Sequence, residues 1–156
     1  MPKFYRKRSF TKAPRDKYSV EQQAAVIDVA AGGQQAVQLI APTSIQGMRK
    51  VKHLTVSVAS NGATSASAIY WALVYVPQGT TPNPLALGTG SYASLYEPNQ
   101  FVLNCGVMDL DAGPARVSTP LSRNLNSGDS IYVILANPAG AAMQLQTVVR
   151  YAITLQ

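Results

Sequence analysis

The stretch SAIYWALVYV, residues 67–76, decides the fold class of this chain. It is almost continuously apolar, and Pro77 ends it. A short apolar run that is bounded by turn signals is typical of a strand buried on both faces. The stretch SIYVILA, residues 130–136, has the same character and is closed by NPAG. Two such strands predict a β-rich core.

Shorter segments of alternating polarity, separated by Gly- and Pro-rich breaks, make up most of the remaining body. In one of them Leu54, Val56 and Val58 share a face, whereas Val51 is out of phase with them, which is consistent with a β-bulge near Lys52. We expect eight strands, at residues 22–30, 34–41, 48–58, 67–76, 100–108, 115–123, 130–136 and 143–155.

Eight strands with long irregular loops favour an all-β fold of two packed antiparallel sheets. An eight-stranded single jelly roll fits this count, and an immunoglobulin-like sandwich fits it equally well. Pro120 makes a central position unfavourable for the strand at 115–123. The cluster NLNSGD, residues 124–129, predicts a turn that includes Asp129.

The charge of the chain is divided between two regions. Residues 1–20 carry one acid, Asp16, and seven basic side chains, namely Lys3, Arg6, Lys7, Arg8, Lys12, Arg15 and Lys17. Their net charge is 7 − 1 = +6, whereas residues 21–156 hold six basic and six acidic side chains and are neutral. We therefore expect a disordered basic N-terminal arm at 1–20 and one folded domain at 21–156.

An arm of this charge favours binding to a polyanion, of which nucleic acid is the usual one. The seven basic residues are its candidate contacts. The cluster Arg6-Lys7-Arg8 is also of the kind that nuclear import receptors bind. The alternative is a terminus that only keeps the protein soluble.

The body has few charges on its surface, and this composition favours contact with further copies of the chain. A neutral monomer would have poor colloidal stability, whereas subunit interfaces are depleted of charge at their centres. The long loop at 77–99 supplies candidate interface anchors, namely Leu85, Leu87, Tyr92, Leu95 and Tyr96. The alternative is that this loop packs on its own body.

A second basic cluster lies within the predicted strand at 48–58. Alternation places Arg49 on the face opposite Lys50 and Lys52. Arg49 and Lys52 are candidate nucleic-acid contacts that would join the arm, and the alternative is solvent exposure or ion pairing with Asp28 or Glu21. We assign no role to three scattered residues, Arg116, Arg123 and Arg150.

No constellation of catalytic residues is present, so we expect a protein that is not an enzyme and uses no cofactor. His53 and Cys105 are the only residues of their kind, which excludes a zinc motif. We expect His53 to be half-buried in its strand and Cys105 to be a buried free thiol. Asp109 and Asp111 are expected to cap a turn, with a calcium site as the alternative.

The chain starts without the apolar segment of a secretory signal, and it has no run of 18 apolar residues. We therefore expect synthesis in a cytosol and no insertion into a membrane.

Four blocks in order, RKVKHLTVSV (49–58), IYWALVYVPQG (69–79), SLYEPNQFVLNCGVMD (94–109) and AGPARVSTPLSRNLNSGDSIYVIL (112–135), resemble capsid proteins of circular Rep-encoding single-stranded DNA viruses related to circoviruses and nanoviruses. The basic start of the chain is shorter and less rich in arginine than typical circovirus arms.

The resemblance implies a single jelly roll with BIDG and CHEF sheets. It also implies an icosahedral T=1 shell of sixty copies around circular single-stranded DNA, in a virion that forms in the host nucleus and cytoplasm. The arm would face inward or emerge for nuclear entry, and the loop at 77–99 would lie at subunit contacts. Two alternatives are a non-viral nucleic-acid-binding β-sandwich and a jelly roll that binds or hydrolyses carbohydrate.

Overall fold

The computed structural model describes residues 18–44, 46–61, 68–83, 87, 100–111, 113–120 and 122–155. Nine strands form in this part of the chain, and it contains no α-helix. The strands are β1 (Ser19–Val29), β2 (Gln34–Ile40), β3 (Arg49–Ser60), β4 (Ile69–Val76), β5 (Phe101–Met108), β6 (Ala115–Ser118), β7 (Arg123–Leu125), β8 (Ser130–Ala136) and β9 (Met143–Leu155).

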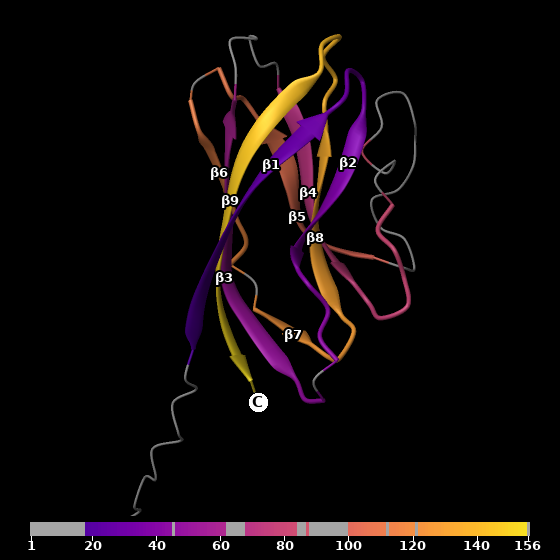
Figure 1. The fold of residues 1–156 in the computed structure, drawn as a ribbon, viewed down its shortest axis with the longest axis vertical. Coiled ribbons are helices and arrows are strands. Elements are labelled where there is room, and N and C mark those ends of the chain that lie inside the picture. The colour runs from indigo at the N-terminus through magenta and orange to yellow at the C-terminus, as the bar shows by residue number, and fades with distance from the viewer. Residues whose placement is uncertain are drawn as a thin grey trace, which may run out of the picture.

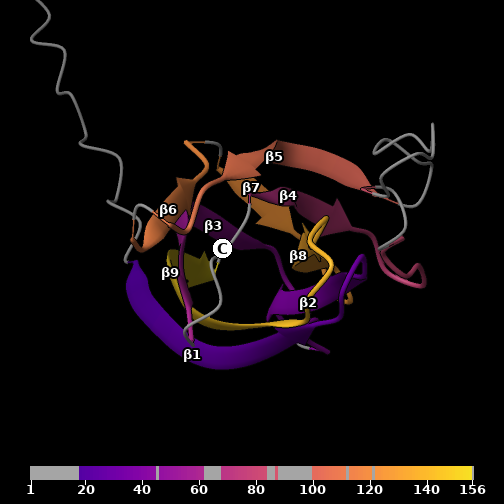
Figure 2. The same cartoon turned by 90° about the horizontal axis from the view of Figure 1, so that it is seen from above.

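The strands form two antiparallel sheets that pack face to face (Figures 1 and 2). Sheet A has the order β1-β9-β3-β6, with β7 also paired to β3, and sheet B has the order β2-β8-β4-β5. With β6 and β7 counted as one interrupted strand, these are the BIDG and CHEF orders of a jelly roll. The predicted fold class is confirmed, and the strand order distinguishes it from an immunoglobulin-like sandwich.

Two predicted strand limits were wrong. The single strand expected at 115–123 is divided into β6 and β7, with Pro120 between them, because proline removes a donor from the ladder. The first strand begins at Ser19 rather than at residue 22, and its first two residues pair with Ile153 and Ala152 of β9. Because the expected strand at 115–123 is divided, the described residues form nine strands instead of eight.

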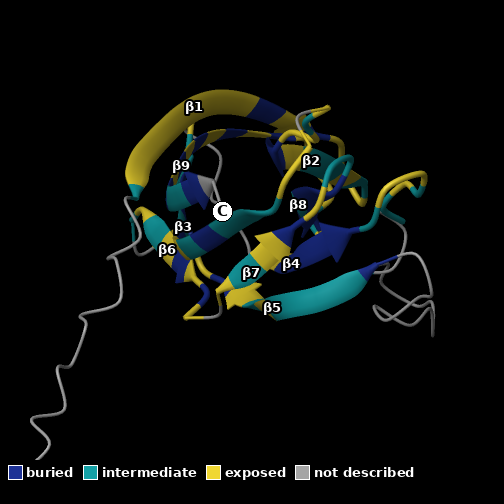
Figure 3. Cartoon of the chain, turned by 90° about the horizontal axis from the view of Figure 1, so that it is seen from below, coloured by how far each residue is buried: buried dark blue, intermediate teal, exposed yellow. Residues whose placement is uncertain are grey.

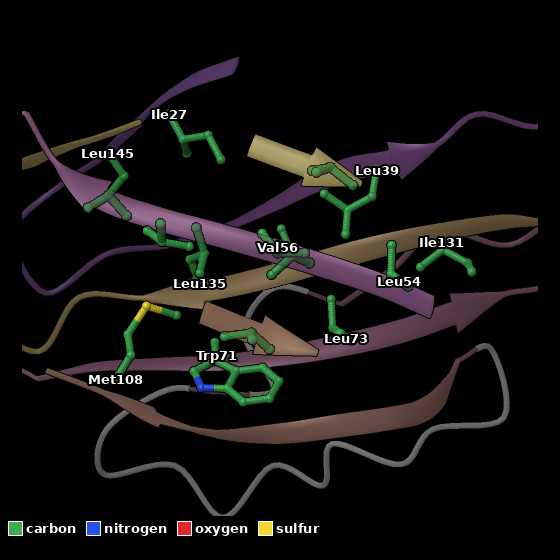
Figure 4. Close-up of a cluster of buried hydrophobic side chains, with 14 of the residues drawn as sticks. Ile27, Leu39, Leu54, Val56, Trp71, Leu73, Met108, Ile131, Leu135 and Leu145 are labelled. Atoms are coloured by element: carbon green, nitrogen blue, oxygen red, sulfur yellow. The ribbon is translucent and has the colours of Figure 1, made fainter. Parts of the chain in front are cut away.

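The core lies between the sheets and is filled from both sides (Figure 4). Leu54 and Val56 of sheet A point toward Leu73 and Trp71 of sheet B (Figure 4), and all four are buried. Complete burial of one such aliphatic side chain is worth about 1.5–3 kcal/mol. The indole of Trp71 lies against Gly106, its cross-strand partner on β5. A larger residue at position 106 would crowd the indole, because an added Cβ would lie only 3.2 Å from it.

The central strands of sheet B are buried on both faces, as their apolar sequences predict (Figure 3). On the side of sheet B that faces away from sheet A, a second cluster contains Ala72, Val74, Val76 and Ile134. Leu87 of the long loop packs against it.

A β-bulge interrupts β3, where the expected break in phase occurs. The register against β9 shifts between Lys52 and Thr55, and between them His53 has a φ of 54°. The extra residue lets Val51 and Leu54 both face the core. The predicted bulge is confirmed, but His53 is exposed rather than half-buried, because the bulge turns it away from the core.

Asp129 connects the segments at one end of the sandwich. Its carboxylate is buried and accepts hydrogen bonds from the Tyr75 hydroxyl at 2.7 Å, from the backbone N–H of Gln78 at 3.1 Å and from the backbone N–H of Asn126 at 2.7 Å. The Arg123 guanidinium stacks over the Tyr75 ring at 4.2 Å from its centroid. The turn residue predicted from NLNSGD therefore joins β4, β7 and β8.

Substitution of Asp129 by Ala should lower the free energy of unfolding by about 3 kcal/mol, because one buried hydroxyl and two partly buried backbone N–H groups lose their acceptor. Asp28→Ala is the matched control, because the exposed Asp28 carboxylate accepts one hydrogen bond, from Gln144, and its loss should cost less than about 0.5 kcal/mol. Urea denaturation of both variants measures the difference. Equal losses would show that Asp129 does not hold this end together.

Stability should fall as the pH rises above 10. Burial, aided by the Asp129 carboxylate, raises the pKa of Tyr75 from 10.0 to about 12, and burial beside Glu21 raises the pKa of Tyr151 as well. As the pH rises, the unfolded chain therefore loses these protons before the folded chain does. The free energy of unfolding should thus decrease between pH 10 and 12. Tyr75→Phe should be less stable at pH 8 and should lose less stability between pH 10 and 12. A slope equal to that of the wild type would contradict this assignment.

Candidate nucleic-acid interface

The predicted arm joins the body at an edge of sheet A. Its seven basic residues, Lys3, Arg6, Lys7, Arg8, Lys12, Arg15 and Lys17, lie outside the described residues. The described chain starts at Tyr18, and the Lys52 ammonium lies 4.7 Å from the centroid of the Tyr18 ring. Such a contact is a cation–π interaction. Lys52 therefore lies at the point where the arm begins.

The second basic cluster is divided between the two faces of sheet A, as alternation predicts. Arg49 lies on the core side, where its guanidinium donates to the Ala41 carbonyl at 3.1 Å and the Asp129 carbonyl at 3.3 Å. Lys50 and Lys52 alternate with the buried Val51 and lie on the opposite face. The Arg49 guanidinium is therefore hydrogen-bonded to backbone carbonyls of the body, whereas Lys50 and Lys52 face outward.

Two further cations share the outer face of sheet A, by which we mean the face turned away from sheet B. Arg150 lies between the buried Val149 and Tyr151, and Arg116 lies next to the buried Val117. Both arginines are exposed. We had assigned them no role, but strand parity would have placed both on this face, since each is adjacent to an inward apolar residue.

The two acids of sheet A, Glu21 and Asp28, accept hydrogen bonds from neutral side chains. The Tyr151 hydroxyl donates to the Glu21 carboxylate at 2.6 Å, on the core side. Gln144 donates to Asp28 at 2.9 Å, at the other end of β1. Among the described residues, neither acid forms an ion pair with a cation of the outer face. The ion pairs considered from the sequence are therefore not formed.

Of the five candidate interface anchors, Leu85, Tyr92, Leu95 and Tyr96 lie outside the described residues. Leu87 packs on the outer cluster of sheet B. Other exposed apolar side chains are Val26 and Val148 on sheet A and the cross-strand neighbours Tyr70 and Val107 on sheet B. These side chains are open to solvent in the single chain.

The expected burial of Cys105 was wrong. Cys105 lies on β5, at the edge of sheet B, opposite Ala72 of β4, and it is an exposed free thiol because its side chain faces away from the core. His53 is exposed on the outer face of sheet A, on the opposite side of the sandwich, so the two do not form a nucleophile–base pair. Asp109 accepts a hydrogen bond from the Asp111 amide at 3.0 Å, which is the turn-capping role.

No group of three or more His, Cys, Asp or Glu side chains that could hold a metal occurs in the described ranges. The same ranges contain no helix that is long and apolar enough to cross a membrane.

No protein-family model matches the chain, and no curated protein is significantly similar to it. Among solved structures, it is similar to a chain of Desmodium yellow mottle tymovirus, with 11% identity, a TM-score of 0.40, and coverage of 100% of this chain and 95% of that chain. Turnip yellow mosaic virus gives 10% identity, a TM-score of 0.37, and coverage of 94% and 85%. A pilus-forming Bacillus endospore appendage gives 15% identity, a TM-score of 0.32, and coverage of 95% and 99%.

With TM-scores below 0.5, these similarities assign neither a family nor a function to the chain. The resemblance to capsid proteins of circular single-stranded DNA viruses therefore remains a prediction from the sequence.

Proposed function

We propose that this protein is a viral capsid protein that assembles into a small icosahedral shell and packages single-stranded DNA through its basic arm. The proposal rests on the division of charge between a basic N-terminal segment and a neutral jelly-roll body. All of the net charge of +6 precedes residue 21, and the folded body is neutral. A neutral surface favours contact between copies, while the cationic arm favours contact with phosphate.

The place where the arm joins the body supports this division of roles. Tyr18 lies against Lys52, at the edge of sheet A, and Arg150 and Arg116 lie further along the same outer face. Nucleic acid held by the arm would therefore meet more positive charge on the body. Exposed apolar residues on sheet B, namely Tyr70 and Val107, remain available for contacts between copies.

The arms alone cannot neutralise a complete genome. About sixty arms of +6 carry roughly 360 positive charges, whereas a genome of about 1,000 nucleotides carries roughly 1,000 phosphates. Small cations, cations of the body or a shorter cargo must supply the difference. Arg6-Lys7-Arg8 would, in the same proposal, direct the protein to the host nucleus through import receptors before it enters the virion.

A non-viral nucleic-acid-binding module is the second candidate, because four cations share one face of the body. It predicts a soluble monomer or dimer, which size-exclusion chromatography distinguishes from a shell. A carbohydrate-binding function is less well supported, because Trp71, the only tryptophan, is buried in the core.

Deletion of residues 2–17 should leave particles that form but contain much less nucleic acid, because the cargo contacts are lost while the body is unchanged. A full-length chain with the seven basic arm residues changed to Gln controls for arm length and should behave in the same way. The ratio of absorbance at 260 nm to that at 280 nm, measured on purified particles, reports the cargo. Normal packaging by both variants would show that the arm does not have this role.

A further inference from the structure

A shallow hollow lies on the outer face of sheet A, near the root of the arm. Its volume is about 240 Å³. Residues from four neighbouring strands line it, among them Val20, His53, Thr55, Arg116, Arg150 and Ala152. A hollow formed by four adjacent strands has a rigid floor, because the sheet's own hydrogen bonds hold it.

The strand register places the two arginines on opposite sides of Thr55. Arg150 of β9 is directly opposite Thr55 of β3, and Arg116 of β6 is opposite Ser57, one outward position further along. Direct neighbours in a sheet lie about 5 Å apart and diagonal neighbours about 7–8 Å apart, within reach of long side chains. Two guanidinium groups, each with a planar set of donors that suits phosphate, can therefore converge on one anion.

His53 adds a third group, and it is held in an unfavourable backbone conformation. Its φ of 54° is in the left-handed region, which costs free energy for a residue other than glycine. The side chain is exposed, so packing in the core does not require histidine at this position. Bulges often redirect one side chain beside a binding site, and here the bulge places an imidazole at the wall of the hollow.

Among the described residues, cations outnumber acids around the hollow. Glu21 is the acid next to it, and its carboxylate accepts a hydrogen bond from Tyr151, which also lines the hollow, whereas Arg116, Arg150, Lys50 and Lys52 share the outer face. Asp28 pairs with Gln144, six residues along β9 from Arg150, which corresponds to roughly 20 Å at about 3.3 Å per residue. The local field therefore favours an anion.

We propose that the hollow formed by His53, Arg116 and Arg150 binds phosphate groups of single-stranded nucleic acid that is also held by the arm. The choice of nucleic acid rests on the proposed function. The geometry and charge of the hollow are independent of it. Lys50 and Lys52, on the same face, extend the positive surface from the hollow to the root of the arm.

The test uses the full chain and a fluorescein-labelled thirty-residue oligodeoxythymidylate, with binding followed by anisotropy at several salt concentrations. Arg116→Gln and Arg150→Gln should each weaken binding about fivefold at about 0.1 M salt and reduce the slope of log affinity against log salt by about 0.7, the contribution of one phosphate on a single strand. Gln35→Glu is the matched control, because it also lowers the net charge by one, at an exposed position on β2 of sheet B. It should leave the slope unchanged.

The outcomes separate this inference from the proposed function. If both arginine variants behave as Gln35→Glu does, while deletion of residues 2–17 still weakens binding, the hollow is not a phosphate site and the arm's role stands. If the wild type does not bind the oligonucleotide at all, both proposals are wrong. If heparin binding depends on the two arginines and oligonucleotide binding does not, the hollow is a site for sulfated glycans, and the inference is overturned.

His53→Gly provides an independent test. Glycine accepts the left-handed conformation without steric cost, so the melting temperature should stay the same or rise. Oligonucleotide binding should weaken, because the imidazole is lost. A variant with a lower melting temperature, or one with unchanged binding, would show that His53 is retained for a reason other than the phosphate.

Discussion

The apolar layer between sheets A and B fixes the side on which every other strand residue lies. Because side chains alternate along a strand, burial of Leu54 and Val56 on β3 and of Val149 and Tyr151 on β9 forces their neighbours outward. Arg150 must face outward, because Val149 and Tyr151 on either side of it face the core. The position of the cations on the body is thus a consequence of core packing.

In the pairing of β3 with β9, the bulge at His53 interrupts this alternation. Without the extra residue, Val51 and Leu54 would lie on opposite faces, and one of them would be exposed. The bulge preserves the core at the cost of one residue in the left-handed region. The same irregularity also shapes the outer face of sheet A beside Arg150. Folding and the proposed binding site therefore depend on the same local feature.

The features that the sequence predicted well are those set by local pattern. The buried strands β4 and β8 were recognisable because they are apolar at consecutive positions, and the bulge was recognisable from the phase of Val51. The division of charge between arm and body required only counting.

Features that depend on the pairing of distant strands were not accessible in this way. Arg116 and Arg150 are far apart in sequence, and only the order β9-β3-β6 brings them to one hollow. Cys105 lies in an apolar strand, but that strand is at an edge, and its position faces outward. Asp129 was recognisable as a turn residue, whereas its hydrogen bond to Tyr75 depends on how β8 pairs with β4.

The central claim is that the arm and the outer face of sheet A contact the cargo together, while other surfaces contact further copies of the chain. The most direct test is electron cryo-microscopy of particles purified from cells that express the full chain. We expect closed shells in which the outer face of sheet A lines the interior, with nucleic-acid density next to Arg116 and Arg150. Shells with this face on their outer surface, or a protein that stays a single subunit under all conditions, would contradict the account.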